Sequence, residues 1–371
     1  MTRGLPAGPG GWRRARRVLA LRLDNLGDLL MTTPALAALK ETWPDAHLTL
    51  LASPAGAAAA AHLPFVDEVW RFEAPWVGAG AHAASPGLAE AGLLVRLADG
   101  GFDAAVIFGV CTQSPLPAAL LCRMAGIPLR LAHCRENPYA LLTDWIPEPD
   151  TVADTMRHEV RRQLDLVATV GWRTRDERLR FTLHEADRRA VAERLAAAGL
   201  APGARYAVLH PGASAPSRRW PAERFGLVGR TLADAGFAVV VAGDAGDGAQ
   251  RAEALAAMQR PALDVGATSL GELAALIGGA AVLVANNSGP AHLAAALGTP
   301  VVVLYALTNP QHTPWQVPAR VLSRSVPCRW CLKSRCPQVH HECLAGVGAD
   351  EAAAAALALA HHPKTLELET R

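Results

Sequence analysis

The amino-acid sequence predicts an α/β protein with two Rossmann-like domains in succession. Short apolar runs, each of the length of a buried strand, alternate with longer segments whose apolar residues recur at helical spacing. This alternation is typical of parallel sheets with helices between the strands. It stops near residue 147 and begins again near residue 205, and a chain of 371 residues is long enough for two domains.

The first half of the chain is expected to contain four strands and four helices. The strands are predicted at 17–23, 47–52, 68–72 and 104–108. The helices are predicted at 28–42, 88–98, 117–125 and 155–170. Pro147-Glu148-Pro149 is a stiff connector that interrupts this pattern.

The second half has the same alternation of strands and helices, although its sequence does not repeat that of the first half. Strands are predicted at 205–209, 237–242, 281–285 and 301–305, and helices at 222–235, 247–259, 270–277, 290–297 and 350–361. The interdomain link is expected within 173–180. We therefore divide the chain into a flexible basic tail (1–16), an N-terminal domain (17–172), a C-terminal domain (173–349) and a C-terminal helix and tail (350–371).

Charge and hydropathy exclude several classes of protein. The chain has 36 basic and 34 acidic residues, a balance that does not suggest a nucleic-acid binder. No apolar run reaches the roughly 20 residues that span a bilayer. The first 17 residues contain five arginines and no acid, but the apolar run after them is too short for a secretory signal. We expect a cytoplasmic protein whose basic tail could contact the inner face of the cytoplasmic membrane.

Ligands of open parallel sheets bind where the strands end, so the loops after strands carry the functional information. The first such loop lies in RLDNLGDLLMTTPAL, residues 22–36. Gly27 allows close approach of a ligand, and the following helix offers free N–H groups. Asp28 could be a general base, although an Asp at this place is more commonly a helix cap.

The second loop is HPGASAPSRRWPAERF, residues 210–225. Small residues followed by the adjacent guanidiniums of Arg218 and Arg219 suit a phosphate-binding loop. Pro221 is well placed for a first helical turn. A solvated basic loop is the plainer interpretation, but the ordered Pro and Gly residues around the arginine pair favour a binding site.

The third loop is Asn287-Ser288-Gly289-Pro290, a turn from a strand into a helix. The free N–H groups and the positive end of that helix could bind a diphosphate. Asn287 or Ser288 could equally be a simple helix cap. His292 lies one turn inside the helix, where a histidine is more often structural.

Four of the seven cysteines lie close together in the sequence, in the order C-x2-C-x4-C-x6-C. They are Cys328, Cys331, Cys336 and Cys343. Four thiolates can hold a structural zinc ion, and His340 or His341 could replace one of them. The spacing is tighter than that of the usual zinc ribbon, so a reduced cysteine cluster without metal is the alternative. Cys111, Cys122 and Cys134 are expected to be buried as small apolar residues.

The blocks RLDNLGDLLMTTPAL, HPGAS…RRWP and NNSGPAHLAAALGTP, in this order, resemble glycosyltransferase family 9, the ADP-heptose:lipopolysaccharide heptosyltransferase group. The resemblance covers residue 17 to about residue 343. It implies a GT-B fold, with two Rossmann-like domains facing across a cleft, the N-terminal one for the acceptor and the C-terminal one for the nucleotide-sugar. It also implies inverting transfer of a heptose, or a related sugar, to a lipopolysaccharide core or similar glycan. No metal or other cofactor is then required for catalysis.

The resemblance also assigns roles to residues. By position, Asp28 matches the catalytic base of the family, and Arg218 matches a residue, often Lys, that meets the donor diphosphate. Asn287 stands where many members have an Asp that contacts the donor sugar, which leaves the identity of the sugar open. The expected donor-binding residues are His210, Gly212, Ser214, Arg218, Arg219, Asn287, Ser288, Gly289 and His292. The expected acceptor-side residues are Asn25, Gly27 and Thr32.

Two other classes of function remain open at this point. One is a GT-B-fold sugar-nucleotide epimerase or hydrolase, which would use the same diphosphate site without an acceptor. The other is a non-catalytic nucleotide-sugar-binding protein with the cysteine cluster as a metal or assembly module. For the transferase, the expected partners are a nucleotide-sugar donor and a lipid-linked or core-oligosaccharide acceptor, and no nucleic acid.

Overall fold

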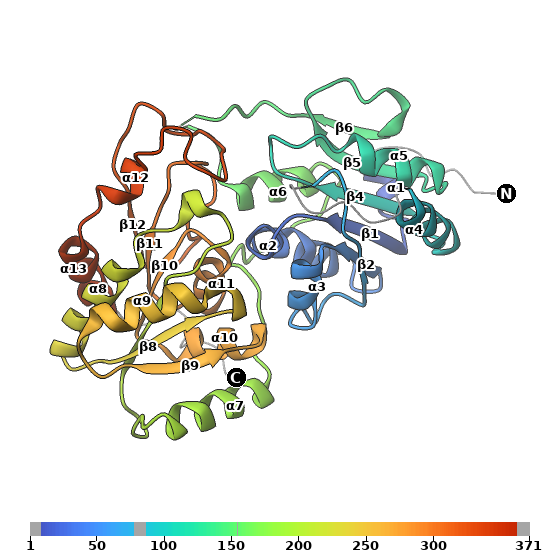
Figure 1. The fold of residues 1–371 in the computed structure, drawn as a ribbon. Helices are drawn as coiled ribbons and strands as arrows, with labels where there is room; N and C mark the ends of the chain where they lie inside the picture. Colours follow the sequence, from blue (N-terminus) through green and yellow to red (C-terminus); the bar gives the residue numbers. More distant parts are fainter. Residues whose placement is uncertain (1–8, 78–86, 154, 362–371) are drawn as a thin grey trace. The chain divides into compact units, whose positions relative to one another are not determined.

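A computed structural model describes residues 9–77, 87–153 and 155–361 (Figure 1). The chain divides into two compact units, one of residues 1–151 and 155–177 and one of residues 152–154 and 178–371. The boundary after residue 177 lies five residues beyond the predicted one and inside the predicted link.

The first unit contains a parallel six-stranded sheet in the order β3-β2-β1-β4-β5-β6 (Figure 1). Its strands are β1 (Arg17–Arg22), β2 (His47–Ala52), β3 (Glu68–Arg71), β4 (Ala104–Phe108), β5 (Leu129–Cys134) and β6 (Asp144–Pro147). Its helices are α1 (Pro9–Trp12), α2 (Leu26–Thr42), α3 (Pro54–Ala60), α4 (Leu88–Asp99), α5 (Leu116–Met124) and α6 (Glu159–Ala168).

The second unit contains another parallel six-stranded sheet, in the order β12-β11-β10-β7-β8-β9. Its strands are β7 (Tyr206–His210), β8 (Ala238–Gly243), β9 (Leu263–Ala267), β10 (Val282–Asn286), β11 (Val301–Leu304) and β12 (Ala319–Leu322). Its helices are α7 (Glu185–Ala197), α8 (Ala222–Asp234), α9 (Gly248–Met258), α10 (Leu270–Gly279), α11 (Gly289–Leu297), α12 (Glu342–Ala345) and α13 (Ala349–Ala360).

Both sheets have the strand order 3-2-1-4-5-6 when strands are counted within each unit, which is the Rossmann order. The prediction of two Rossmann-like α/β domains is confirmed. The strands that the sequence did not predict lie toward the edges of the two sheets: β5 and β6 in the first unit, β9 and β12 in the second. In β5, buried Arg130 interrupts the apolar run; its guanidinium donates to backbone carbonyls, including that of Leu141 at 2.6 Å.

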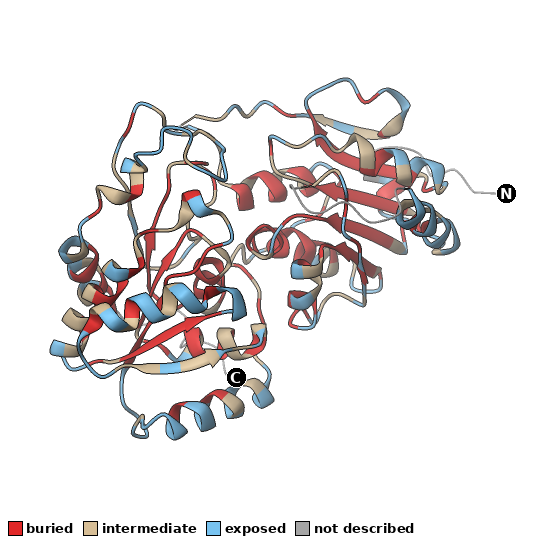
Figure 2. Cartoon of the chain, in the orientation of Figure 1, coloured by how far each residue is buried: buried red, intermediate tan, exposed pale blue. Residues whose placement is uncertain are grey.

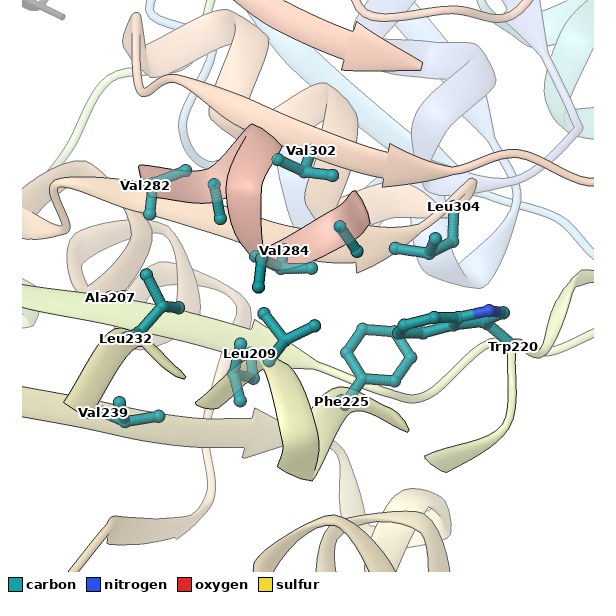
Figure 3. Packing of buried hydrophobic residues seen from close by; sticks show 14 of the residues in the cluster. Ala207, Leu209, Trp220, Phe225, Leu232, Val239, Val282, Val284, Val302 and Leu304 are labelled. Atoms are coloured by element: carbon teal, nitrogen blue, oxygen red, sulfur yellow. The ribbon is translucent and has the colours of Figure 1, made fainter. Parts of the chain in front are cut away.

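The central strands are buried on both faces, as Figure 2 shows, which is why their sequences are continuously apolar. In the second unit, Leu209 of β7 and Val284 of β10 pack in one cluster with Trp220 and Phe225 (Figure 3). The two aromatic rings meet edge to face, with centroids 5.1 Å apart. Because Trp220 is buried here, the core anchors the end of the loop that precedes α8.

The prediction of a flexible tail over residues 1–16 is corrected from residue 9 onward. Residues 1–8 lie outside the described residues. Trp12 has no exposed surface, and its ring meets that of Trp172 edge-on with centroids 5.9 Å apart. Burial of the Trp12 indole against Trp172 holds the short helix α1 against the first unit. The basic composition of the predicted tail does not reveal this contact.

The chain beyond residue 349 was expected to form a C-terminal helix and tail, and the helix is present as α13. Helix α13 packs into the core of the second unit through buried Ala352, Ala356 and Leu359. Residues 362–371 lie outside the described residues. In the part of the chain that the structure describes, no helix is long and apolar enough to cross a membrane.

Candidate functional site: the switch points of the two sheets

Each sheet has a switch point, where the connections leave two adjacent strands toward opposite edges. In the first unit it lies between β1 and β4, and in the second between β7 and β10. Ligands of open α/β sheets bind at the carboxyl ends of such strands. The sequence blocks around Asp28, His210 and Asn287 all follow these strands, so the fold places each at a switch point.

Asp28 lies in the first turn of α2. The helix begins at Leu26 with Asn25 as its N-cap, and Asp28 is the third helical residue, near the N-cap as predicted, where it forms a capping box with Asn25. Its carboxylate accepts a hydrogen bond from the backbone N–H of Asn25, at 3.1 Å. The Thr32 hydroxyl donates to the Asp28 carbonyl at 2.8 Å. The predicted acceptor-side residues Asn25, Gly27 and Thr32 therefore belong to the same helix end as Asp28.

Arg22 ends β1 and is the centre of a buried charge cluster that the sequence did not predict. Its side chain has no exposed surface. Its guanidinium nitrogens lie 3.0 Å from a carboxylate oxygen of Asp24, 3.5 Å from one of Asp28 and 3.0 Å from one of Glu159. Burial disfavours the charged guanidinium, but the three carboxylates outweigh this effect and raise the pKa of Arg22. Burial also raises the pKa of Asp24 to about 6, although Arg22 opposes the rise.

Helix α6 connects this cluster to the end of β4. Glu159 accepts a hydrogen bond from Gln163 at 2.6 Å. Gln163 and Arg162 both donate to the carbonyl of Gly109, the residue that follows β4. A pocket at this edge is lined by polar groups that include Asp24, Gln113, His133, Arg162 and Gln163. Burial lowers the pKa of His133, which favours its neutral form.

One sequence signal could have revealed the charge cluster. Arg22 is the last residue of an otherwise apolar strand, and a charge in a buried strand requires partners of opposite charge. The partner Glu159 lies 137 residues away, so no local pattern identifies it.

In the second unit, Asn286 holds the loop after β7 in place. It ends β10 and is fully buried. Its amide nitrogen donates to the carbonyl of Pro211 at 2.8 Å, and its amide oxygen accepts from the backbone N–H of Trp220 at 3.0 Å. The two ends of the loop are thus held by one side chain. Of the two adjacent asparagines, only Asn287 was predicted as a site residue.

His210 and Gly212 occupy the start of this loop. A Cβ atom at Gly212 would lie 2.0 Å from the Asp247 carboxylate, so no other residue fits without displacing that side chain. Burial lowers the pKa of His210, although the charge of Asp247 opposes the shift. Ser214 is exposed in the middle of the loop.

The two arginines of the loop differ in their contacts. Arg219 donates from Nε to the carbonyl of Ala213 at 2.7 Å and so braces the loop. Arg218 ends the 3-10 turn Pro216–Arg218, and its guanidinium has no hydrogen-bond or ion-pair partner among the described residues. Its positive charge acts on the Tyr305 hydroxyl, whose pKa burial raises to about 12. Arg218 is thus a cation available to a ligand at the edge of this sheet.

The residues after β10 form the other side of this site. Asn287 is buried, and its amide oxygen has no hydrogen-bond partner among the described residues. Ser288 is the N-cap of α11, but its hydroxyl donates to the Asn286 carbonyl and caps no N–H of the helix. Pro290 has no N–H, and the Ala291 N–H donates to the Ser288 carbonyl at 3.0 Å, so in the first turn of α11 the N–H of Gly289 is the group that could bind an anion. His292 is buried one turn further along.

The cysteine-rich segment contacts the same loop. Ser217 donates from its backbone nitrogen to the Ser334 carbonyl at 2.9 Å and from its hydroxyl to the Lys333 carbonyl at 2.7 Å. The His341 ring lies 2.6 Å from the Ser217 carbonyl. Because Ser217 precedes Arg218, the segment supports the turn that presents this guanidinium.

The four cysteines of that segment are partly buried. Cys328 Sγ lies 3.9 Å from His340 Nε2. Burial raises the pKa of Cys343, and the other three thiols add to the rise. Within the described ranges, no three His, Cys, Asp or Glu side chains are arranged to hold a metal ion.

The model of glycosyltransferase family 9 (heptosyltransferase) matches residues 96–341, about two thirds of the chain. The chain belongs to this family. The resemblance drawn from the three sequence blocks is thereby confirmed.

Individual relatives agree with the family match. Lipopolysaccharide heptosyltransferase 2 of Escherichia coli K12 is 34% identical over 121 residues, 31% of this chain and 32% of that protein. The match thus spans about a third of the relative's length. A solved structure of a family 9 glycosyltransferase from Veillonella parvula has a TM-score of 0.76 at 22% identity, covering 93% of this chain and 97% of that one. The E. coli ADP-heptose lipopolysaccharide heptosyltransferase II structure has a TM-score of 0.71 at 23% identity, covering 93% and 98%.

At these identities the solved structures show a shared fold. Because both cover more than nine tenths of this chain, the likeness extends over both units. The expectation of a GT-B fold for this family 9 member is confirmed at the level of its two Rossmann-like units.

Replacing Asn286 with Ala tests whether this side chain holds the loop. The substitution leaves the Trp220 N–H and the Pro211 carbonyl without a buried partner, so the free energy of unfolding should fall by about 1–3 kcal/mol. Urea denaturation measures the loss. Ser214→Ala, in the exposed part of the same loop, should change stability by less than about 0.5 kcal/mol. A loss that small in Asn286→Ala would contradict the assignment.

Proposed function

We propose that this protein transfers a heptose from ADP-heptose to a lipopolysaccharide core sugar or a similar glycan, with inversion at the anomeric carbon and without a catalytic metal. The observation that carries the proposal is the position of Asp28, the residue that matches the base of the family, at the switch point of the first sheet. The printed names of the relatives, lipopolysaccharide heptosyltransferase 2 and ADP-heptose lipopolysaccharide heptosyltransferase II, support the choice of donor and acceptor class.

The second unit supplies groups suited to the donor. The leaving group is a nucleoside diphosphate, which gains negative charge as the bond to the sugar breaks. Arg218 and the Gly289 N–H at the positive end of α11 can stabilise that charge. Asn287 would meet the sugar with a neutral amide, which donates and accepts hydrogen bonds, where a carboxylate only accepts.

The first unit supplies the group suited to the acceptor. In a single displacement, the acceptor hydroxyl oxygen bonds to the anomeric carbon while the bond from that carbon to the diphosphate oxygen breaks and its electron pair leaves with ADP. The hydroxyl proton passes to the Asp28 carboxylate. One displacement inverts the configuration, and the cationic donors of the second unit take the place of a metal.

Asp28→Asn tests the base directly. An Asn oxygen can still accept the hydrogen bond from Asn25, so stability should change little, while turnover should fall roughly 100-fold or more. Steady-state assays of ADP release measure the loss. The matched control is Asp103→Asn, because Asp103 accepts backbone hydrogen bonds from Arg16 and Arg17 at the opposite end of β1. Full turnover in a folded Asp28→Asn protein would refute the role.

Arg218→Ala tests the donor site. A charge-assisted contact to phosphate contributes about 1.5–3 kcal/mol, so the Kd for ADP-heptose should rise about 10- to 150-fold. Acceptor affinity should stay the same. Calorimetry measures both. Arg320→Ala is the control, since Arg320 is an exposed residue of edge strand β12. Equal donor affinity in Arg218→Ala and the parent protein would contradict this part of the proposal.

We also propose that the four thiols of the cysteine-rich segment bind a structural zinc ion. Thiolates at this spacing suit zinc, and a four-thiolate set also suits iron. The described side chains do not form the ligand set as they stand, so the segment would have to close around the metal, and no catalytic step depends on it. The contacts to Ser217 would then link metal binding to the donor loop.

Metal analysis and chelation test this proposal. The purified protein should contain about one zinc or iron ion per chain. A chelator should lower the melting temperature because metal binding is coupled to folding. It should also weaken donor binding through Ser217. A protein that contains neither metal, and whose melting a chelator does not change, has ordinary reduced cysteines.

A further inference from the structure

We propose that Arg22 and Glu159 are positioning residues for the Asp28 base: Arg22 orients the carboxylate, and Glu159 fixes Arg22 from the opposite side. The inference rests on the proposed function, in which Asp28 accepts the proton of the acceptor. Arg22 is the first residue of the sequence block that contains Asp28, where no role was predicted for it, and Glu159 lies outside all three blocks.

The geometry around Arg22 supports a positioning role. A hydrogen bond of 3.0 Å joins Nη1 to Glu159, and Nε lies 3.0 Å from Asp24. The guanidinium is a rigid planar fork, so fixing two of its nitrogens sets the direction of the third. That third nitrogen, Nη2, lies 3.5 Å from Asp28.

The contact to Asp28 is the loosest of the three. Neither Nε nor Nη2 of Arg22 has an acceptor at hydrogen-bonding geometry among the residues that the structure describes, and Nη2 lies the farther of the two from its carboxylate. The other oxygen of Asp28 accepts the Asn25 N–H at 3.1 Å, so the carboxylate is held at the helix start and beside the cation. The longer contact to Arg22 suits a base, because a base must also reach the hydroxyl whose proton it takes.

The charges of the cluster are unequal. Arg22 faces three carboxylates, one of which, Glu159, is shared with the buried guanidinium of Arg162 at 3.6 Å, whereas a buried ion pair needs only one carboxylate. The Glu159 side chain has no exposed surface, that of Asp24 is 5% exposed, and that of Asp28 is 11% exposed. The excess of negative charge favours proton uptake, and the carboxylate most open to a substrate is Asp28.

These contacts predict opposite effects for two substitutions. The charged groups placed beside Asp28 are Arg22 and Asp24, with Glu159 and Arg162 of α6 behind Arg22. Helix α3, which also packs on α2, consists of Pro, Ala and Gly. Loss of the positive charge in Arg22→Gln makes the Asp28 carboxylate easier to protonate. Loss of a negative charge in Glu159→Gln makes it harder to protonate.

The pH dependence of kcat/KM tests the proposal. The acidic limb should move to higher pH in Arg22→Gln, by about one pH unit or more, and to lower pH in Glu159→Gln, by a smaller step. The matched control is Glu148→Gln, because Glu148 forms a similarly buried ion pair with Arg162 and is joined to the cluster through the 3.6 Å contact of Arg162 with Glu159. Its acidic limb should lie closer to that of the parent protein than the limb of either other variant.

A purely structural cluster would lower stability in all three variants and leave the limb in place. Circular dichroism and thermal melting establish that each variant is folded. If Arg22→Gln does not fold, Arg22→Lys keeps the charge and loses the fork, so kcat should fall about tenfold while the limb stays near its parent position. The predicted shift of the acidic limb to lower pH in Glu159→Gln then still tests the proposal.

Failure of the proposed base and failure of the positioning role give different results. An active Asp28→Asn protein overturns the proposed base and with it this inference. An inactive Asp28→Asn protein, together with an unmoved acidic limb in folded Arg22→Gln and Glu159→Gln, overturns only the positioning role. Shifts of the same sign in both variants also overturn it, because charge acting on Asp28 requires opposite signs.

Discussion

The switch point of a parallel sheet is the constraint on which this protein depends. Where the connections of two neighbouring strands leave toward opposite edges, the carboxyl ends of those strands are not covered by a crossing loop. In the first unit β1 ends there at Arg22, and in the second β10 ends there at Asn286. Both side chains are fully buried, and each organises the polar groups of its own sheet edge.

The two sheet edges bury polar groups in different ways. At Arg22 a guanidinium is surrounded by three carboxylates, one of which is shared with Arg162. At Asn286 a neutral amide satisfies the loop backbone, and the guanidinium of Arg218, in the same loop, has no hydrogen-bond or ion-pair partner among the described residues. In the proposed transfer, the first edge would supply the proton acceptor and the second the diphosphate site.

The sequence predicted the central strands and the three functional loops, because continuous apolar runs and turn residues are local signals. It did not predict β5, in which the buried guanidinium of Arg130 donates to backbone carbonyls, including that of Leu141. It also did not predict the burial of Trp12 against Trp172. It placed Asp28 at or near the N-cap of its helix, where the structure has it as the third helical residue. The contact between Arg22 and Glu159, in contrast, spans 137 residues and has no local signature. Cysteine spacing alone likewise does not determine whether four thiols converge on a metal.

The most direct test of the account is the dependence of ADP release on the acceptor. The full-length protein is incubated with ADP-heptose, with and without a lipopolysaccharide core acceptor that lacks the heptose, and ADP and the glycan product are both quantified. We predict one heptose added to the acceptor for each ADP released, and negligible release without acceptor. Release of ADP at the same rate without acceptor, or recovery of an epimerised sugar nucleotide, would contradict the assignment of a transferase.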